Sequence, residues 1–286
     1  MKPDLCLYHA DCDDGFAAAY AVRARFGDDV RFVPAQYGCP PPDVAGLDVL
    51  IVDFSYPADV LREMGETAHR IVVLDHHKTA QAALAAFPSI DIADRAAVAR
   101  ADPGTFVHFD MEKSGCRLAW EYCFGHEGMR LMPAWMGHIE DRDLWRFDLT
   151  GTREVSATLR SHPRDFNTWD CFSRDRLVAE GRPIVRYIER IVDNIAKTAW
   201  EEEIGGHRVP VAACSYDFVS EVGHRLLQLH PDAPFAAGVV LSYGARRYSL
   251  RSDDSRTDVA EIARAFGGGG HRNAAGFTMP TNGELT

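Results

Sequence analysis

The tripeptide DHH at positions 75–77 follows directly on a short apolar run. Two further polar positions stand at the ends of similar runs: His9, which opens the stretch HADCDD (9–14), and Asp53. Unpaired charges buried at such positions would cost several kcal/mol each, so we expect a bound cation to offset them. Carboxylates mixed with imidazoles favour a divalent ion such as manganese or magnesium, with zinc or iron less favoured.

Asp53 ends its apolar run between the other two clusters and is well placed to bridge two cations. Such a pair of cations activates a water and clamps phosphoryl oxygens. Taken singly, each residue has a simpler explanation, because a strand-end histidine is usually satisfied within the fold and an aspartate after a strand is usually a helix cap or turn residue. Their joint placement at the ends of successive strands favours the metal site.

The segments that must position these residues alternate between strand and helix patterns. Apolar or alternating runs predict strands at 5–9, 30–36, 49–53 and 70–75. Helices are predicted over 15–26 and 57–69. This alternation predicts a parallel sheet with helices on both faces, whose ligands sit beyond the carboxyl ends of the strands.

The rest of the chain divides into a helical region, a linker and a second α/β pattern. Helices are predicted over 113–124 and 129–141, and a long charged stretch, 174–203, carries isoleucines close to helical spacing. From 206 onward, strands are predicted at 208–213, 236–242 and 247–251 and helices at 221–229 and 258–266. We therefore predict an α/β protein with a catalytic domain over 1–172, a linker helix over 173–205 and a smaller α/β domain over 206–286.

Composition excludes several classes of function. The formal net charge of −11 argues against a broad grip on long duplex nucleic acid. The seven cysteines are scattered without a C-x-x-C pair, which argues against a disulfide framework and against structural zinc. No apolar run reaches the roughly 18 residues of a membrane span, so we expect a cytoplasmic protein without membrane contact. The glycine patterns of nucleoside triphosphatases and dinucleotide-binding enzymes are absent from the sequence.

A second candidate site lies in the C-terminal domain. Four glycines, 267–270, precede His271 and a turn into a predicted strand. A flexible linker is one interpretation, but glycines also let backbone amides approach an anion closely, which favours a phosphate or nucleotide site. Arg251 and Ser252 end another predicted strand, and arginine offers a bidentate fork for phosphate.

Five motifs in order, HADCDDG (9–15), VDFS (52–55), DHH (75–77), EDRD (140–143) and GGGGHRNAAGF (267–277), resemble the DHH phosphoesterase superfamily with its DHH-associated C-terminal domain. The resemblance covers essentially the whole chain. It implies that Asp53 bridges two metals and that His76 and Asp141 are metal ligands, and we expect His9 to be a ligand at the same site.

The resemblance also implies roles for the neighbouring residues. Asp75 would orient the adjacent histidines, and His77 would face the substrate phosphate. Arg251, Ser252, Gly268, Gly269, Gly270 and His271 would hold the end of the substrate. Two divalent metal ions, manganese with magnesium as the alternative, would serve as cofactors.

The first motif departs from the commonest family pattern, H-x-x-x-D-x-D. Asp11 and Asp13 alternate with His9 and could share a face with it in an extended segment. Counting back from Gly15 instead gives Asp14 as the second acid and leaves Cys12 at the position of the first. Superfamily members with an H-x-x-C-x-D-G-F form are similar, so we favour Asp14. Because a thiolate suits manganese poorly, we take Asp11 as the missing oxygen ligand. In the fourth motif we prefer Asp141 to Asp143, as Asp141 follows an apolar helical run.

The resemblance implies a metal-dependent phosphodiesterase that cleaves short single-stranded oligonucleotides to mononucleotides with a water activated by two metals. One alternative is a phosphatase or phosphodiesterase acting on a small nucleotide, such as a 3′-phosphoadenosine phosphate or a cyclic dinucleotide. An alternative of another class is a non-catalytic nucleic-acid-binding module with a decayed metal site. Superfamily members often form homodimers, although no heptad seam in this sequence demands one.

Overall fold

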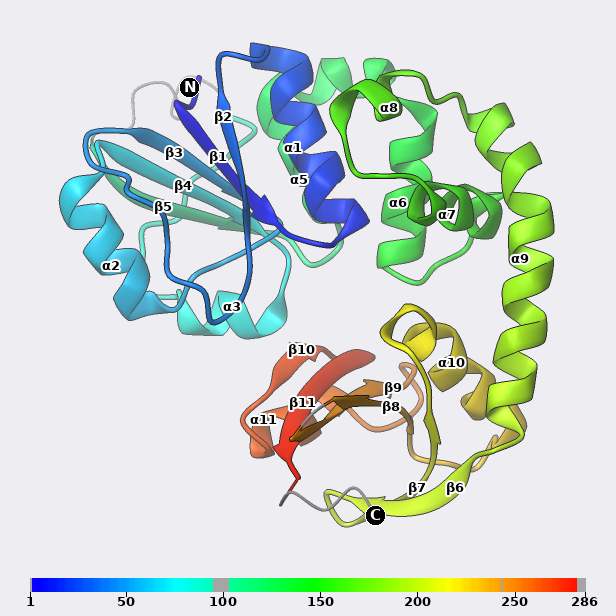
Figure 1. The fold of residues 1–286 in the computed structure, drawn as a ribbon. Coiled ribbons are helices and arrows are strands. Elements are labelled where there is room, and N and C mark those ends of the chain that lie inside the picture. Colours follow the sequence, from blue (N-terminus) through cyan, green and yellow to red (C-terminus); the bar gives the residue numbers. More distant parts are fainter. Residues whose placement is uncertain (1, 95–102, 243, 282–286) are drawn as a thin grey trace. The chain divides into compact units, whose positions relative to one another are not determined.

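The computed structural model describes residues 2–94, 103–242 and 244–281, and its contacts divide the chain into two compact units, Met1–Val185 and Arg186–Thr286 (Figure 1). The strands of the first unit are β1 (Leu5–His9), β2 (Arg31–Ala35), β3 (Asp48–Val52), β4 (Arg70–Asp75) and β5 (Gly104–Phe109). Its helices are α1 (Asp13–Phe26), α2 (Ala58–Thr67), α3 (Lys78–Ala83), α5 (Gly115–Phe124), α6 (Ala134–Asp143), α7 (Thr152–Ser161) and α8 (Phe166–Asp170), with a 3₁₀ helix at His126–Leu131.

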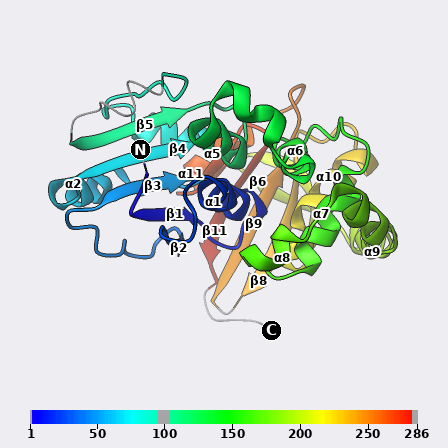
Figure 2. The ribbon, with the colours of Figure 1, turned by 90° about the horizontal axis from the view of Figure 1, so that it is seen from above.

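The five strands form a parallel sheet in the order β2-β1-β3-β4-β5, which confirms the predicted α/β fold. Alternate strand residues feed two cores, because successive side chains of a strand point to opposite faces. Leu50 and Val52 of β3 pack with α1 and α5, whereas Val49 and Ile51 pack with Leu61 and other residues of the opposite face. Figure 2 looks along α1 and shows it beside α5.

In parallel sheets a crevice is expected where the strand order reverses, and here the order reverses between β1 and β3. From β1 the chain passes through α1 to β2 on one side, and β3 then returns to the other side of β1. The connections after β1 and β3 enter helices on opposite faces of the sheet, so the carboxyl ends of these two strands are a topological switch point. His9 ends β1 and Asp53 follows β3, which places both residues at this crevice.

The second unit contains a mixed sheet of order β10-β11-β9-β8-β7-β6, in which β7 and β8 are parallel and the other neighbours antiparallel. Its strands are β6 (Trp200–Ile204), β7 (His207–Ala213), β8 (Ala236–Ser242), β9 (Ala245–Arg251), β10 (Gly269–His271) and β11 (Ala274–Pro280). Its helices are α10 (Val219–Leu229) and α11 (Val259–Ala265), with a 3₁₀ turn at Tyr216–Phe218.

Helix α9 (Arg174–Ala196) runs across the boundary between the units. Leu177, near its start, belongs to the core of the first unit, whereas Val192 and Ala196 belong to a core of the second. The expected linker helix is therefore too long at its end, because 200–204 form the edge strand β6, paired with β7. None of the helices in the described ranges has the length and apolar character needed to cross a membrane.

Candidate metal centre

Asp53 occupies the centre of the site. Its backbone has a left-handed conformation, with φ of 55°, and its amide donates to the carbonyl of Leu74 at 2.9 Å. This conformation is uncommon for a residue other than glycine, although aspartate tolerates it better than most. The left-handed turn at Asp53 follows the last residue of β3. The carboxylate of Asp53 is buried close to the first turn of α5. There Gly115 makes room for it, because a Cβ atom on Gly115 would lie 2.4 Å from the Asp53 Cβ.

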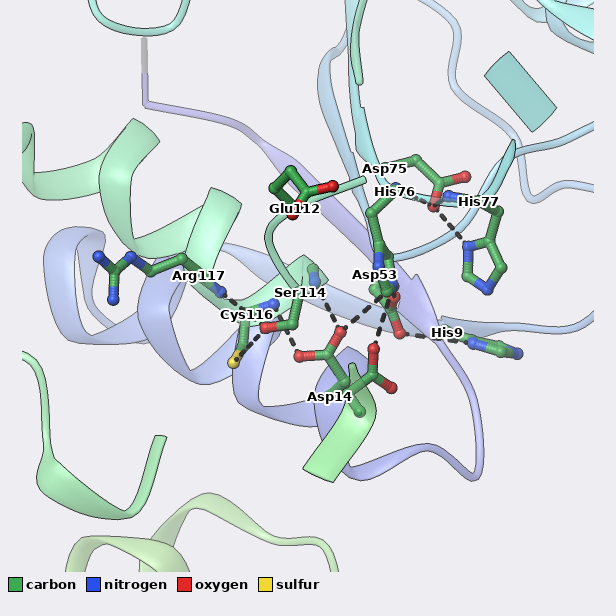
Figure 3. Close-up of polar contacts among 12 residues, drawn as sticks. His9, Asp14, Asp53, Asp75, His76, His77, Glu112, Ser114, Cys116 and Arg117 are labelled. Atoms are coloured by element: carbon green, nitrogen blue, oxygen red, sulfur yellow. Dashed lines mark hydrogen bonds and ion pairs between the residues drawn. The ribbon is translucent and has the colours of Figure 1, made fainter. Parts of the chain in front are cut away.

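The two carboxylate oxygens of Asp53 face two different histidines (Figure 3). Oδ2 lies 3.4 Å from Nδ1 of His9, and Oδ1 lies 3.1 Å from Nε2 of His76. Asp53 and His76 are almost completely buried. One carboxylate is thus shared between a histidine from β1 and a histidine from the end of β4.

Two more carboxylates approach His76. Oδ2 of Asp14 lies 3.6 Å from Nε2 of His76, and Oδ2 of Asp143 lies 3.5 Å from the same atom. Asp14 also accepts hydrogen bonds from the amides of Gly115 at 2.6 Å and Cys116 at 2.9 Å, so it caps helix α5 while it faces the site. The structure therefore gathers Asp14, Asp53, His76 and Asp143 into one donor group.

The electrostatics of this group favour a bound cation. Burial, together with the neighbouring carboxylates of Asp53 and Asp143, holds the pKa of Asp14 well above its ordinary value. Burial alone would lower the pKa of His76, yet the carboxylates of Asp143 and Asp53 raise it well above the usual range. Both shifts report a strongly negative field inside the site, which a divalent cation would offset.

The spacing of the donor atoms also fits a cation. Two ligand atoms that each lie about 2.1 Å from a metal are about 3.0 Å apart at a right angle and about 3.4 Å apart at a tetrahedral angle. The histidine–carboxylate distances in the site run from 3.1 to 3.6 Å. Imidazole nitrogen and carboxylate oxygen are ligands for divalent metals, and the residues present fit that group.

Asp75 fixes the orientation of His77. The fully buried Asp75 carboxylate accepts from Nδ1 of His77 at 2.6 Å, from the amide of His76 at 2.7 Å and from the hydroxyl of Ser55 at 2.5 Å. Burial opposes its ionisation, but the His77 imidazole and the Ser55 hydroxyl hold the pKa of Asp75 below its ordinary value. The hydrogen bond to Asp75 therefore holds the His77 ring in one orientation.

The structure favours Asp143, not the expected Asp141, as the acid of the metal site. The Asp141 carboxylate accepts from the amides of Asp148 at 2.8 Å and Leu149 at 3.1 Å and from the hydroxyl of Thr152, so it holds the turn that follows α6. Asp143 is the acid beside His76. Helix α6 starts after Pro133 and ends at Asp143, later than predicted at both ends. Residues two apart on a helix differ by about 200° in direction, so only one of the two acids can face the site.

The expectation that Asp11 supplies an oxygen ligand is also not supported. Asp11 has a left-handed backbone, with φ of 54°, and its carboxylate accepts from the side-chain amide of Gln36 at 2.9 Å. The thiol of Cys12, by contrast, groups with His9 and Asp53. The extended segment assumed for Asp11 ends in this turn, which directs its side chain away from the donor atoms.

Two of the expected substrate-binding residues, Arg251 and His271, lie on one face of the sheet in the second unit. In the sheet register His271 pairs with Ala274, which pairs in turn with Arg251, so these residues point to the same face. The Arg251 guanidinium donates to the Ser220 hydroxyl at 2.6 Å. Ser252 is buried, and its hydroxyl donates to the carbonyl of Thr257 at 2.7 Å.

The glycine run has a structural explanation that the sequence analysis missed. Gly267 adopts a φ of 76° and, with Gly268, closes α11, as their amides donate to the carbonyls of Arg264 and Ala263. A Cβ on Gly268 would lie 2.1 Å from the carbonyl oxygen of Gly276. The Gly268 amide is thus engaged within the chain, while Gly269 and Gly270 form β10, and the expected role of these glycines in holding a substrate stays a prediction.

Because Asp141 and Asp143 make different contacts, we expect the same substitution to weaken metal binding at one position and stability at the other. We expect Asp143→Asn to weaken Mn²⁺ binding on the order of 10- to 100-fold while thermal stability without metal is retained. We expect Asp141→Asn to lower the free energy of unfolding by about 1–3 kcal/mol, because an amide cannot accept at both positions. Urea denaturation and equilibrium dialysis of both variants check this. If Asp141→Asn weakened Mn²⁺ binding and Asp143→Asn did not, Asp141 would be the metal ligand, as expected from the sequence.

The chain is similar in sequence to known proteins. No protein-family model matches the chain. An uncharacterized protein of Acanthamoeba polyphaga mimivirus is 31% identical over 303 residues, which cover 96% of this chain and 67% of that protein. Oligoribonuclease NrnB of Bacillus subtilis is 37% identical over 126 residues, or 44% of this chain and 30% of NrnB.

A solved structure shares the fold. RecJ of Thermus thermophilus in complex with Mn²⁺ matches with a TM-score of 0.54 at 16% identity, covering 97% of this chain and 50% of RecJ. The solved DHH domain of PF0399, a member of the s1p family of ribosomal proteins, matches with a TM-score of 0.53 at 13% identity, covering 95% of this chain and 81% of that chain. The chain therefore belongs to the DHH phosphoesterase superfamily, whose members are phosphoester hydrolases.

Proposed function

We propose that this protein hydrolyses short single-stranded oligonucleotides to mononucleotides with the help of two divalent cations. The observation that carries the proposal is the shared carboxylate of Asp53, which turns one oxygen to His9 and the other to His76. Manganese, with magnesium as the alternative, suits the nitrogen and oxygen donors of the His76 group. When bound, such a pair lowers the pKa of a water and polarises phosphoryl oxygens.

The protein's own residues orient and neutralise the substrate. Asp14, Asp53, His76 and Asp143 would hold the cations, and His77 would meet the phosphate. Burial opposes the charged form of His77, but the Asp75 carboxylate raises its pKa, so that a positive charge is available where negative charge develops. Asp75 keeps that imidazole in one orientation throughout the reaction.

Further observations support a short nucleic acid as the substrate and a divalent cation as the cofactor. The relative that matches 44% of this chain is named an oligoribonuclease. A net charge of −11 repels long polyanions more than short ones. The fold is shared with RecJ, whose structure contains Mn²⁺.

The test is mononucleotide release from a labelled dinucleotide and a labelled 24-mer by the full-length protein with Mn²⁺. We expect the dinucleotide to be cleaved and the 24-mer to be spared, and His77→Ala to reduce turnover about 10²-fold. His69→Ala is a matched control, since His69 pairs with Asp48 at 2.9 Å at the opposite end of the sheet. Faster release of phosphate from 3′-phosphoadenosine phosphate would favour the small-nucleotide alternative, and inactivity on all substrates would reject the proposal.

A further inference from the structure

We propose that the thiol of Cys12 is a metal ligand and makes the His9 side of the site a position for softer divalent cations such as Co²⁺ or Zn²⁺. The proposal deepens the proposed function and rests on its two cation positions. The His9 group would then differ in kind from the His76 group, although both share Asp53.

Three donors of different chemistry meet at the His9 side. A ring nitrogen of His9, the sulfur of Cys12 and a carboxylate oxygen of Asp53 all lie within 4.8 Å of one another. They come from the end of β1, the turn into α1 and the residue after β3, which the switch point brings together. An imidazole, a thiolate and a carboxylate form a mixed ligand set that suits zinc and cobalt.

Buried atoms at this position are left without hydrogen bonds. Nδ1 of His9 and Oδ2 of Asp53 are both buried and 3.4 Å apart, yet within the described ranges neither makes a hydrogen bond. The side chain of Asp53 is only 2% exposed, so water does not compensate for this. A buried polar atom without a partner costs free energy, and a cation between these atoms would remove that cost.

The neighbouring acids are engaged elsewhere. Asp11 accepts from Gln36, and Asp13 forms an ion pair with Arg164 at 2.8 Å. Cys12 itself is the N-cap residue of α1, but its side chain makes no capping hydrogen bond. Serine, threonine, aspartate and asparagine are the usual choices there, so a cysteine is not explained by capping.

A role as a nucleophile does not suit this thiol. Burial and the carboxylates of Asp53 and Asp14 raise the pKa of Cys12 well above its ordinary value, which is the reverse of an activated cysteine. As a metal ligand, the thiol would release its proton to solvent when the cation binds. Thiolate prefers Co²⁺ and Zn²⁺ to Mg²⁺ and Mn²⁺, whereas the His76 group offers three carboxylates and suits the harder ions.

The test is a Co²⁺ titration of the metal-free full-length protein, followed by the near-ultraviolet charge-transfer absorption of a cobalt–thiolate bond. We expect the band in the wild type and its loss in Cys12→Asp, which keeps an oxygen ligand and a good N-cap. Equilibrium dialysis should show Cys12→Asp shifted in favour of Mn²⁺ over Zn²⁺ on the order of 10- to 100-fold. Circular dichroism verifies that the variants are folded.

Cys116→Ala is the matched control, because Cys116 is a buried cysteine near Asp14 whose sulfur contacts Ser114 at 3.3 Å. This variant should keep the band. Bound Co²⁺ without a band, or a band that survives in Cys12→Asp, would overturn the proposal. Dinucleotide hydrolysis is measured in parallel, so a band without hydrolysis would reject only the proposed function, and hydrolysis without a band only the thiolate ligand.

Discussion

Asp53→Ala is expected to abolish both cation positions at once and to reduce kcat/KM for a dinucleotide on the order of 10³- to 10⁴-fold. The reason is that each oxygen of Asp53 faces a different histidine, so one substitution removes a ligand from both donor groups. Transition-state stabilisation by metal ions is worth several kcal/mol, and about 1.4 kcal/mol corresponds to tenfold in rate.

Steady-state kinetics and thermal denaturation with and without Mn²⁺ measure this effect. Ligands that bind only the folded state raise Tm, so Mn²⁺ should raise Tm of the wild type and leave that of Asp53→Ala unchanged. Asp48→Ala is the control, because Asp48 starts the same strand, β3, at its other end. If Asp53→Ala kept the Mn²⁺-induced rise in Tm, the shared-carboxylate site would be rejected.

Gly115→Ala is expected to reduce hydrolysis about 10³-fold at limiting Mn²⁺, although the added group is a single methyl. Its Cβ would lie 2.4 Å from the Cβ and 2.7 Å from Oδ1 of Asp53. Either Asp53 or the start of α5 must move, and the Gly115 amide that donates to Asp14 would move with it. A displacement of about 1 Å costs on the order of 10²-fold in rate, and weakened metal binding adds to this loss.

The control for this prediction is Gly137→Ala in α6, the helix that carries Asp143. A Cβ at Gly137 would make ordinary contacts, at 3.7 Å from Leu149 and 3.9 Å from Met132. We expect unchanged activity and a gain in stability of up to about 1 kcal/mol, as alanine replaces glycine within a helix. Equal activity of Gly115→Ala and the wild type at limiting Mn²⁺ would contradict the packing argument.

Short apolar runs made much of the fold predictable. The run at 70–75 matches β4, and 5–9 matches β1, because continuous apolar runs suit strands buried on both faces. Strand β5 was missed although its sequence, GTFVHF, partly alternates between apolar and polar residues. Helices α7 and α8 were missed too, since short elements carry few turns over which periodicity can be recognised.

The site was less predictable than the fold, because the sequence gives the residue types but not the direction in which each side chain points. The choice between Asp141 and Asp143 depends on where α6 begins, and element ends are the least certain part of a prediction from sequence. The choice between Asp11 and Cys12 depends on a left-handed turn that no periodicity reveals. The roles of Asp75 and His77 as metal-site neighbours stay predictions, although their hydrogen bond is in the structure.

Helix α5 begins against one of the protein's own acids. The amides of Gly115 and Cys116 donate to Asp14, and the amide of Arg117 donates to the Ser114 hydroxyl. In many proteins, such amides at the positive end of a helix grip a phosphate directly. Here they are occupied, so a phosphate at this end of α5 would depend on positive charges that are not permanent, namely those of bound cations and of a titrating imidazole. Affinity for an anion would then be set by the supply of metal rather than by the backbone.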